Sequence, residues 1–520
     1  MVPKIGIEDI NYILAKMCEI SFWVYFVGGY IVYKVVYFWN FDTLYHIPGP
    51  WWSVFTSLPY QTKRLSGDID RYSRYLHTKY GTIVRIGPQM VSICKNQDIR
   101  LILSSHKYPK SRAYEKSVTN EYDIFSTTRP DFNKMRRMQL GRPLTQTSII
   151  DAEELITKRG IEQLIKKLDQ DINVGNGYCI INLLTLFQSL TADIIAELTF
   201  GETFEAVKNG GHPVLQWIEY TIKVAVMGMI FPLSNYFPVI FKKMKQGKQK
   251  MMEYVFSRVQ KRRLLSKMKQ KTHIKQDILQ SCLLAVNRNG KKLTESQIIA
   301  EIMILILAGT DTTGITMTWL IHFYLLYPRV FERVVEEIKR EFPDKTKRIG
   351  YKEALKKLPY SVATIKECMR IKPAASGVLP RDSSSDGVRL SGGYVPPDTV
   401  IMLVVEGGNY DKSVWENPDK FMPERFLGEK GKLLTKKLVT FSSGVRSCPG
   451  KNLVWMEILT VIPNLVRGYN IELLSDSVYR PDKIDQSRQN EPLLYKDYNY
   501  GTRVIADYEN VCRVKISHRK

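Results

Sequence analysis

The most continuous run of apolar positions lies near the N-terminus of the chain. Residues 21–39 read SFWVYFVGGYIVYKVVYFW, with Lys34 as their single charge and aromatic residues near both ends. A helix of this length can span a bilayer if Lys34 reaches towards one interface, and a buried core helix is the alternative. Residues 46–52 (HIPGPWW) cannot continue a helix, because proline lacks the amide donor. The pattern predicts a membrane anchor followed by a stiff break.

The polar and apolar positions behind this break predict mostly helices. Residues 80–94 (YGTIVRIGPQMVSIC) are an exception, because β-branched residues flank a Gly-Pro turn, which is typical of a β-hairpin. Helix-forming and loop signals alternate through the middle of the chain. No repeat or low-complexity linker divides residues 53–520, so we expect one large domain, mainly α with small β-sheets.

One predicted helix carries an unusual interruption. Thr294 and Gln297 form a capping-box pattern, and an apolar run follows over residues 298–307. Residues 308–314 (AGTDTTG) are then small or polar, before the sequence becomes apolar again. A polar cluster inside an apolar helix is unfavourable unless its groups are satisfied or used. We therefore expect a core helix whose polar notch faces a site, with a threonine-rich kink as the alternative.

Composition narrows the classes of partner. The net charge of +24 is compatible with nucleic acid, an anionic membrane or an acidic protein, but solvated lysine-rich helices account for much of it. No zinc-finger or RNA-binding signature is present, so we expect no nucleic acid. The seven cysteines are scattered and never form a C-x-x-C pair. This argues against a disulfide framework or structural zinc, and favours a reducing compartment.

One cysteine stands in a distinctive loop, residues 441–450 (FSSGVRSCPG). A buried structural cysteine needs no frame of glycine, serine and proline, whereas an accessible thiolate that holds a metal does. The pattern F-x-x-G-x-R-x-C-x-G resembles the haem-thiolate loop of the cytochromes P450, and the resemblance extends from about His46 to the C-terminus. It implies the cytochrome P450 fold for residues 46–520, preceded by one transmembrane helix within residues 1–45.

The resemblance assigns roles within the loop. Cys448 would ligate the iron of haem b, and its electron donation would favour O–O cleavage. Gly444 and Gly450 would allow tight turns of the backbone. Arg446 would pair with a haem propionate, and Phe441 would pack against the ring.

The notch in the core helix resembles the oxygen-activation site of the family. Small side chains at Ala308 and Gly309 would leave room for dioxygen above the iron. Asp311 and Thr312 would then relay protons through water, as positioned acids.

Three further residues resemble a buried structural network of the family, which supports the cysteine loop. Glu367 and Arg370 lie at i and i+3 of a predicted helix, and Arg425 would complete the network.

Two more arginines are expected to reach the propionates. Arg381, in GVLPRD, matches one family position, and Arg136 matches another. The residue one turn before Arg136 is Phe132, where relatives usually have tryptophan or histidine. Phe132 can stack but cannot donate a hydrogen bond to a propionate.

The substrate side is implied by the resemblance at residues 114–129, 224–240 and 376–379. Residues 224–233 (VAVMGMIFPL) are apolar and contain methionine, which suits a flexible lid, a membrane contact or an ordinary helix end. The substrate would be a mostly apolar small organic molecule, and fungal specialised metabolism, with a cyclic-dipeptide or other peptide-derived scaffold, is one candidate setting. Sterol, fatty-acid or xenobiotic hydroxylation is an alternative.

The resemblance also implies partners and a location. Electrons would come from NADPH through cytochrome P450 reductase, whose docking face is acidic. The chain would cross the endoplasmic reticulum membrane once, with the catalytic domain facing the cytoplasm. Two other classes stay open: a reductase-independent haem-thiolate isomerase or dehydratase, and a non-catalytic haem-binding protein.

Overall fold

A computed structural model describes residues 16, 19, 21–33, 36, 41–117, 121–231, 241–268, 277–287 and 290–519. Three sequence predictions extend beyond these residues. Lys34 and Trp39 of the predicted anchor lie outside the described residues, and so do residues 232–240 of the predicted lid and residues 118–120 of the substrate side.

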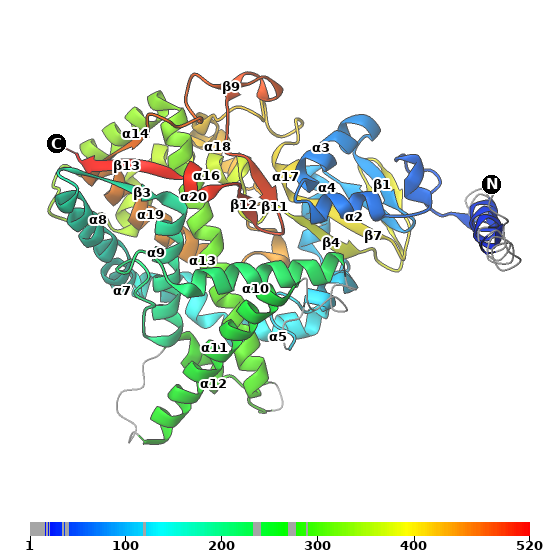
Figure 1. The fold of residues 1–520 in the computed structure, drawn as a ribbon, viewed down its shortest axis with the longest axis horizontal. Helices are drawn as coiled ribbons and strands as arrows, with labels where there is room; N and C mark the ends of the chain where they lie inside the picture. The colour runs from blue at the N-terminus through cyan, green and yellow to red at the C-terminus, as the bar shows by residue number, and fades with distance from the viewer. Residues whose placement is uncertain are drawn as a thin grey trace, which may run out of the picture.

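Helices make up most of the described chain, and they gather on one side of the molecule (Figure 1). The longer helices are α3 (Ile69–Tyr80), α5 (Pro130–Leu140), α8 (Glu162–Val174), α9 (Leu183–Phe200), α10 (Pro213–Ile230), α11 (Lys242–Met268), α13 (Glu295–Leu326), α14 (Pro328–Glu341), α16 (Pro359–Ile371) and α19 (Lys451–Gly468). The shorter ones are α2 (Leu58–Leu65), α4 (Asn96–Ser104), α6 (Gln146–Asp151), α7 (Glu153–Ile156), α12 (Ile278–Leu284), α15 (Tyr351–Lys357), α17 (Val405–Asn409), α18 (Gly428–Thr435) and α20 (Tyr508–Val511), with the 3-10 turns η2 (Arg112–Ser117) and η7 (Gly444–Arg446) among the connections.

The strands form small sheets, the largest of which lies on the opposite side of the molecule (Figure 1). Its order is β1-β2-β7-β4, with β2 and β7 parallel and the other pairs antiparallel. The strands are β1 (Ile83–Gly87), β2 (Met90–Ile93), β3 (Tyr178–Asn182), β4 (Val378–Asp382), β5 (Val388–Leu390), β6 (Gly393–Val395), β7 (Val400–Val404), β8 (Tyr469–Leu473), β9 (Ile484–Asp485), β10 (Glu491–Pro492), β11 (Asp497–Asn499), β12 (Arg503–Ile505) and β13 (Arg513–His518). The predicted hairpin is therefore confirmed as β1 and β2, and the fold is mainly helical with small sheets.

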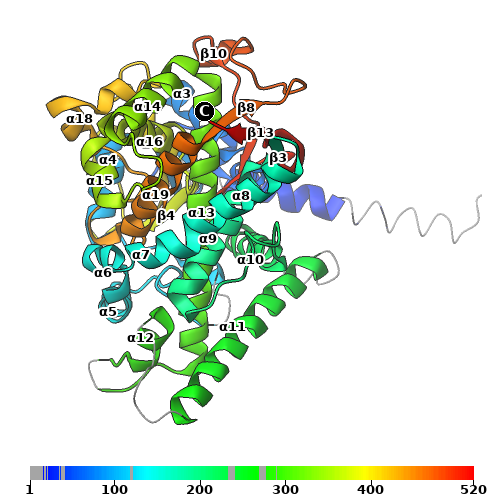
Figure 2. The same cartoon turned by 90° about the vertical axis from the view of Figure 1, so that its left-hand side faces the viewer.

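Helix α13 runs through the helical part beside α9 and α19 (Figure 2). The predicted capping box is confirmed: the Thr294 hydroxyl accepts from the Gln297 N–H, and the Gln297 side chain accepts from the Thr294 N–H. The helix passes through the polar notch without a break. Two of its hydroxyls are satisfied locally, because Thr312 and Thr316 each donate to the carbonyl four residues earlier, at 2.8 Å. The buried hydroxyls of Thr310 and Thr313 have no hydrogen-bond partner among the described residues.

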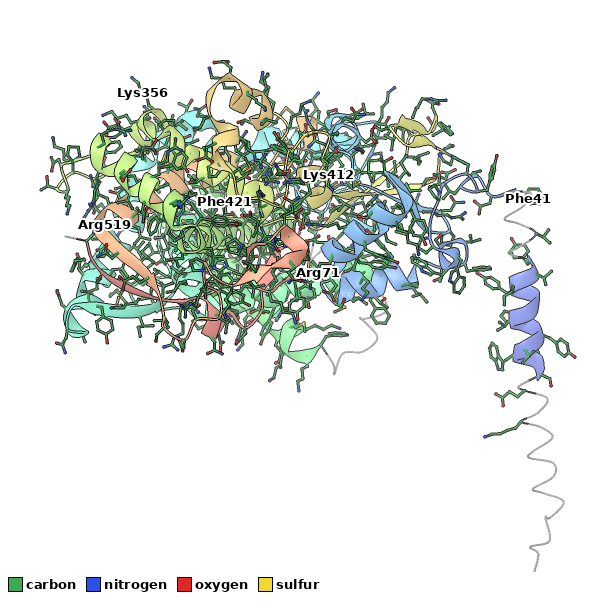
Figure 3. The ribbon with its side chains drawn as sticks, turned by 90° about the horizontal axis from the view of Figure 1, so that it is seen from above. Phe41, Arg71, Lys356, Lys412, Phe421 and Arg519 are labelled. Carbon is green, nitrogen blue, oxygen red and sulfur yellow. The ribbon has the colours of Figure 1, made fainter. Side chains whose placement is uncertain are left out.

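The N-terminal apolar segment forms a helix over Ser21–Tyr33 that stands apart from the body (Figure 3). Phe22 and Trp23 are 62% and 56% exposed, so this helix is not a buried core helix. The described stretch Ser21–Tyr33 is by itself shorter than a bilayer crossing requires, and residues 16, 19, 36 and 41 on either side of it are helical as well. Two described helices are long and apolar enough to cross a membrane, α9 and α13, but most of each is buried within the protein. Both are therefore core helices.

Candidate active site

A cavity of about 450 Å³ is lined by residues from segments that lie far apart in the sequence. Its walls come from the notch of α13, from α10, from β4, from η2, from the loop between β11 and β12, and from the cysteine loop. Most of the lining is apolar, including Met229, Met303 and Leu307. The side chain of Cys448 borders this cavity, so the thiol is accessible from inside the protein.

The backbone of the cysteine loop explains one of its two glycines. Gly444 has a φ of +55°, and a Cβ there would lie 2.6 Å from the Cα of Ser104, so a side chain at this position would be both strained and obstructed. Gly450 has an ordinary φ of −82°. The tight turn expected there does not require glycine, and a Cβ would simply lie 3.9 Å from the Cys448 sulfur. The Cys448 N–H donates to the Phe441 carbonyl at 2.8 Å, which closes the loop.

Burial raises the pKa of the Cys448 thiol, while the N–H groups of Gly450 and Lys451 and the charge of Arg137 oppose that rise. Helix α19 begins at Lys451, so its positive end lies beside the sulfur. These groups favour the thiolate only in part. A bound cation would complete the stabilisation, as expected for a metal ligand.

Cations converge on the cavity without enough carboxylates to neutralise them. Arg381 and Arg446 line it together with Lys110. All three nitrogens of the Arg446 guanidinium, and Nε of Arg381, are buried with no hydrogen-bond partner among the described residues. Burial and the charges of Arg381 and Arg446 hold the pKa of Lys110 well below its usual range. Such a cluster requires an anionic partner, and the two carboxylates of a haem b meet that requirement.

The structure does not bring Arg136 to this cluster. Its Nε lies 3.1 Å from Glu301 of α13, with both side chains buried, and it borders a separate small cavity together with Phe132. The guanidinium of Arg136 stacks 4.7 Å from the Phe132 ring. The next residue, Arg137, lines the main cavity instead and donates to the Ser447 carbonyl at 2.8 Å. A one-residue step turns a side chain by about 100° around a helix, which separates the two arginines.

The notch of α13 faces the cavity through Ala308, Gly309 and Thr312. Gly309 also permits close packing, because a Cβ there would meet Cγ1 of Ile195 in α9 at 3.0 Å. Asp311 does not line the cavity; its carboxylate accepts from Nε2 of Gln188 at 2.8 Å, and burial raises its pKa to about 6. The predicted relay residues are therefore adjacent in the helix but face different neighbours.

The predicted structural network is assembled in one buried place. Glu367 is bonded to Arg370 at 2.8 Å and to Arg425 at 3.1 Å. Arg370 also donates to the carbonyl of Asn409, at 3.0 Å. The amide of Asn409 in turn contacts Thr440, which directly precedes Phe441. A continuous chain of polar contacts thus joins α16 to the start of the cysteine loop.

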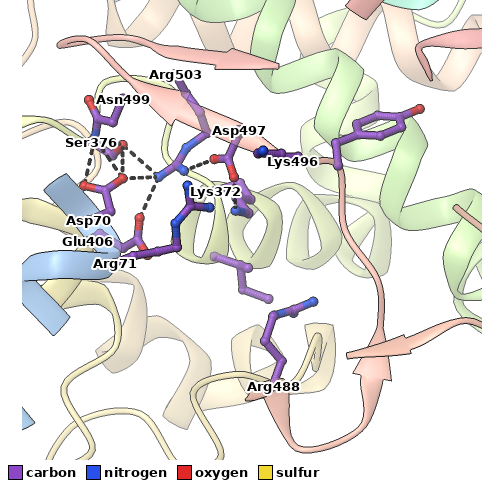
Figure 4. A network of polar contacts seen from close by, with 12 residues as sticks. Asp70, Arg71, Lys372, Ser376, Glu406, Arg488, Lys496, Asp497, Asn499 and Arg503 are labelled. Atoms are coloured by element: carbon purple, nitrogen blue, oxygen red, sulfur yellow. Dashed lines mark hydrogen bonds and ion pairs between the residues drawn. The ribbon is translucent and has the colours of Figure 1, made fainter. Parts of the chain in front are cut away.

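A second polar network holds the loop between β11 and β12, which supplies residues 499–502 to the cavity wall (Figure 4). The guanidinium of Arg503 bonds Glu406 at 2.7 Å and Ser376 at 2.7 Å, and is also paired with Asp497. Asn499 donates to Asp70 at 2.8 Å. The network therefore fixes this cavity-lining loop against α3, α17 and the segment just before β4.

A mainly helical protein with an accessible cysteine and a cationic cluster on one cavity fits the class of haem-thiolate oxidoreductases. Comparison with known proteins agrees: the family model described as Cytochrome P450 matches residues 46–496. Among relatives, cytochrome P450 monooxygenase helB1 of Aspergillus fumigatus is 29% identical over 95% of this chain and 85% of its own length. Its paralogue helB2 is 30% identical over 85% of this chain and 88% of its own length. Cytochrome P450 monooxygenase FUS8 of Gibberella fujikuroi is 27% identical, covering 83% and 84%. The chain therefore belongs to the cytochrome P450 family, and it is an oxidoreductase of the monooxygenase type.

Three basic residues of the cavity escaped the sequence interpretation: Lys110, Arg137 and Arg64. Lys110 and Arg64 lie in segments without a recognisable motif, so the sequence offered no signal for them. Arg137 could have been found, because it stands beside Arg136 in a helix whose register decides which of the two faces the cavity.

Proposed function

We propose that this enzyme binds haem b through Cys448 and inserts one oxygen atom from O2 into a mostly apolar small organic substrate. The observation that carries the proposal is the single cavity onto which Cys448 and the incompletely neutralised cations Lys110, Arg381 and Arg446 face. When bound, haem supplies the redox-active iron at which dioxygen is reduced and activated.

The protein would hold this group from several sides. Cys448 would ligate the iron, and Phe441 would pack against the ring. Arg381 and Arg446 would bind the propionates, with Lys110 beside them. We do not retain Arg136 in this role, because it is occupied by Glu301; Arg137 takes its place.

Proton delivery would come from the notch of α13. The Thr312 hydroxyl donates to the Ala308 carbonyl, so its oxygen can accept a hydrogen bond from the cavity. Asp311, with its pKa raised to about 6 by burial, would exchange protons in that pH range, and its carboxylate interacts with Thr502, which lines the cavity. Because Ala308 has a small side chain and Gly309 has none, this part of the cavity wall would leave room for dioxygen.

The apolar lining supports an apolar substrate body, and it includes Val226 and Met229 of α10 and Met303 and Leu307 of α13. Fungal specialised metabolism is the setting that we propose, because the relatives above are fungal monooxygenases. A peptide-derived scaffold such as a cyclic dipeptide is one candidate, and sterol, fatty-acid or xenobiotic hydroxylation is the alternative.

Residues 1–45 would anchor the enzyme to the endoplasmic reticulum membrane, with residues 46–520 as the catalytic domain on the cytoplasmic side. The exposed aromatic surface of the Ser21–Tyr33 helix supports this arrangement. NADPH-cytochrome P450 reductase would deliver electrons, and the charge of +24 would steer its acidic face. A reductase-independent isomerase is less well supported, because Asp311 and Thr312 are both present. Turnover without NADPH and reductase would favour that class.

The test of haem-thiolate ligation is the reduced, CO-bound absorption spectrum of purified protein. We expect the thiolate-type band in the wild type and its loss in Cys448→Ala. Cys179→Ala, which removes a half-buried thiol in β3, is the matched control and should keep the band. A wild-type spectrum without the band would overturn the proposal.

The substrate is found by untargeted mass spectrometry of the native host with and without this gene. We expect one compound to disappear and a less oxidised precursor to accumulate. A precursor of sterol type would overturn the specialised-metabolism setting while leaving the enzyme class intact.

A further inference from the structure

The cavity contains one charged side chain to which the proposed haem site assigns no role. Arg64, in α2, lines the cavity and is only 7% exposed. Its Nη1 donates to Oε1 of Gln61 at 2.9 Å, which is its single side-chain hydrogen bond among the described residues. A neutral amide oxygen does not neutralise a guanidinium. Arg64 therefore carries a buried positive charge with donors left over.

No carboxylate of the described residues serves as its partner. The only acid that lines the cavity among these residues is Asp123, which accepts from the N–H groups of Phe125 and Ser126 at 2.7 Å and lies near Lys110. Asp70, which is closer in sequence, is bonded to Asn499 and Arg503. Burial lowers the pKa of Arg64, and the ionisable side chains that act on it are the phenols of Tyr60 and Tyr114, with no carboxylate among them.

The surroundings of Arg64 belong to the substrate side of the cavity. Helix α2 packs against α10, which supplies Ile222, Val226 and Met229 to the lining. The Tyr500 hydroxyl donates to the carbonyl of Ser66 at 3.4 Å, so the loop after β11 closes over the end of α2. An otherwise apolar wall thus contains a single guanidinium, and the Gln61 amide holds one side of it in place.

We propose that Arg64 binds a carboxylate of the substrate, so that the enzyme oxidises an apolar organic acid rather than a neutral molecule. The inference rests on the proposed function, because both place the substrate in this cavity. A guanidinium forms two parallel hydrogen bonds with a carboxylate, which fixes position as well as charge. One end of the substrate would be held at α2, and the apolar remainder would extend towards the notch of α13. A neutral cyclic dipeptide would leave the Arg64 charge unpaired.

Equilibrium dialysis of the holoenzyme with decanoate and with methyl decanoate tests the charge directly, because the two probes share the apolar chain. We expect decanoate to bind more tightly than its ester. In Arg64→Met, the dissociation constant for decanoate should rise about tenfold or more, whereas that for the ester should change less than about twofold. Arg64→Lys should keep part of the preference. Lys63→Met, an exposed neighbour on the same helix, should change neither constant.

Several outcomes would overturn the inference: equal affinities of the wild type for acid and ester, equal losses for both in Arg64→Met, or no measurable binding of decanoate. The wild-type comparison stands even if Arg64→Met does not fold. The precursor that accumulates in the host lacking this gene gives a second readout, since an acid is retained on an anion-exchange resin. A neutral precursor would end the Arg64 inference but leave the proposed function standing, whereas loss of the thiolate band would end the proposed function.

Discussion

At the scale of single residues, the main feature of the site is its buried arginines, which have no carboxylate partner among the described residues. Arg446 has three buried nitrogens without a hydrogen bond, and Arg64 has one neutral acceptor. A folded protein rarely keeps such groups, because burying an unpaired charge is unfavourable by several kcal/mol, of order 3–5 when a partner is removed. These charges are the basis of our two proposals for anionic partners from outside the chain: haem propionates near Cys448, and a substrate acid at α2.

Thr312 has a role that can be separated from haem binding. Its side chain lines the cavity together with that of Thr313, and its hydroxyl donates to the Ala308 carbonyl. In Thr312→Ala we expect the haem content to stay normal, while the fraction of NADPH electrons recovered in product falls several-fold and hydrogen peroxide rises, because positioned acids contribute about 10²–10⁴-fold to proton transfer. Thr312→Ser keeps the hydroxyl and serves as control. Normal coupling in Thr312→Ala would remove the proton-relay role.

Asp311 should make stability depend on pH. Its pKa is raised from 3.8 to about 6 by burial, so the folded state binds more protons than the unfolded state between these values. The unfolding free energy should therefore fall as the pH rises from about 4 to 6, by up to about 3 kcal/mol. Asp311→Asn should lose this dependence and be the more stable protein at pH 7. Urea unfolding across this range measures it, with the exposed Asp386→Asn as control. A difference from wild type that does not vary with pH would contradict the assignment.

At the scale of elements, position along a helix decides which side chains meet. The capping box and the Glu367–Arg370 pair depend only on spacing within one helix, and both were predicted from the sequence. The choice between Arg136 and Arg137 depends on the rotation of α5 against α13, where Glu301 pairs with Arg136. No spacing rule contains that rotation, because it is set by the packing of two helices distant in sequence.

The network from α16 to the cysteine loop should be needed for stability. Replacing Glu367 by Gln leaves Arg370 and Arg425 without their carboxylate in a buried site, so we expect a loss of about 3–5 kcal/mol and a lower haem content. Urea unfolding and haem absorbance per protein would measure both. Glu429→Gln removes an exposed ion pair with Lys432 and should cost less than about 1 kcal/mol. Equal losses of stability in the two variants would show that the buried network contributes no more than an exposed ion pair.

At the scale of the whole molecule, the N-terminal helix and the body are distinct. The body contains the large hydrophobic core around α13 and α19, whereas the side chains of Ser21–Tyr33 lie exposed beside it. Exposed aromatic and aliphatic residues in one helix indicate a surface that contacts a membrane or another protein.

Removal of residues 1–45 should therefore change location and not fold. We expect the truncated protein to move from the membrane pellet to the soluble fraction after high-salt washing, with its haem spectrum unchanged. The full-length protein, which should stay in the pellet, is the control. A truncated protein that stays in the pellet would mean that another surface, such as the apolar end of α10, holds the membrane.

The sequence by itself determined the family, the cysteine loop, the polar notch, the hairpin and the helical class, because each depends on residue types at short spacing. Tertiary structure alone decided that Arg137 and not Arg136 lines the main cavity, that Asp311 accepts from Gln188, that Gly450 needs no special backbone, and that Lys110 and Arg64 face the cavity. Each of these outcomes depends on which groups from segments distant in sequence lie close together in the folded protein. Whether a charge is buried, and which group pairs with it, is decided only when the chain folds, so neither could be predicted from the order of its residues.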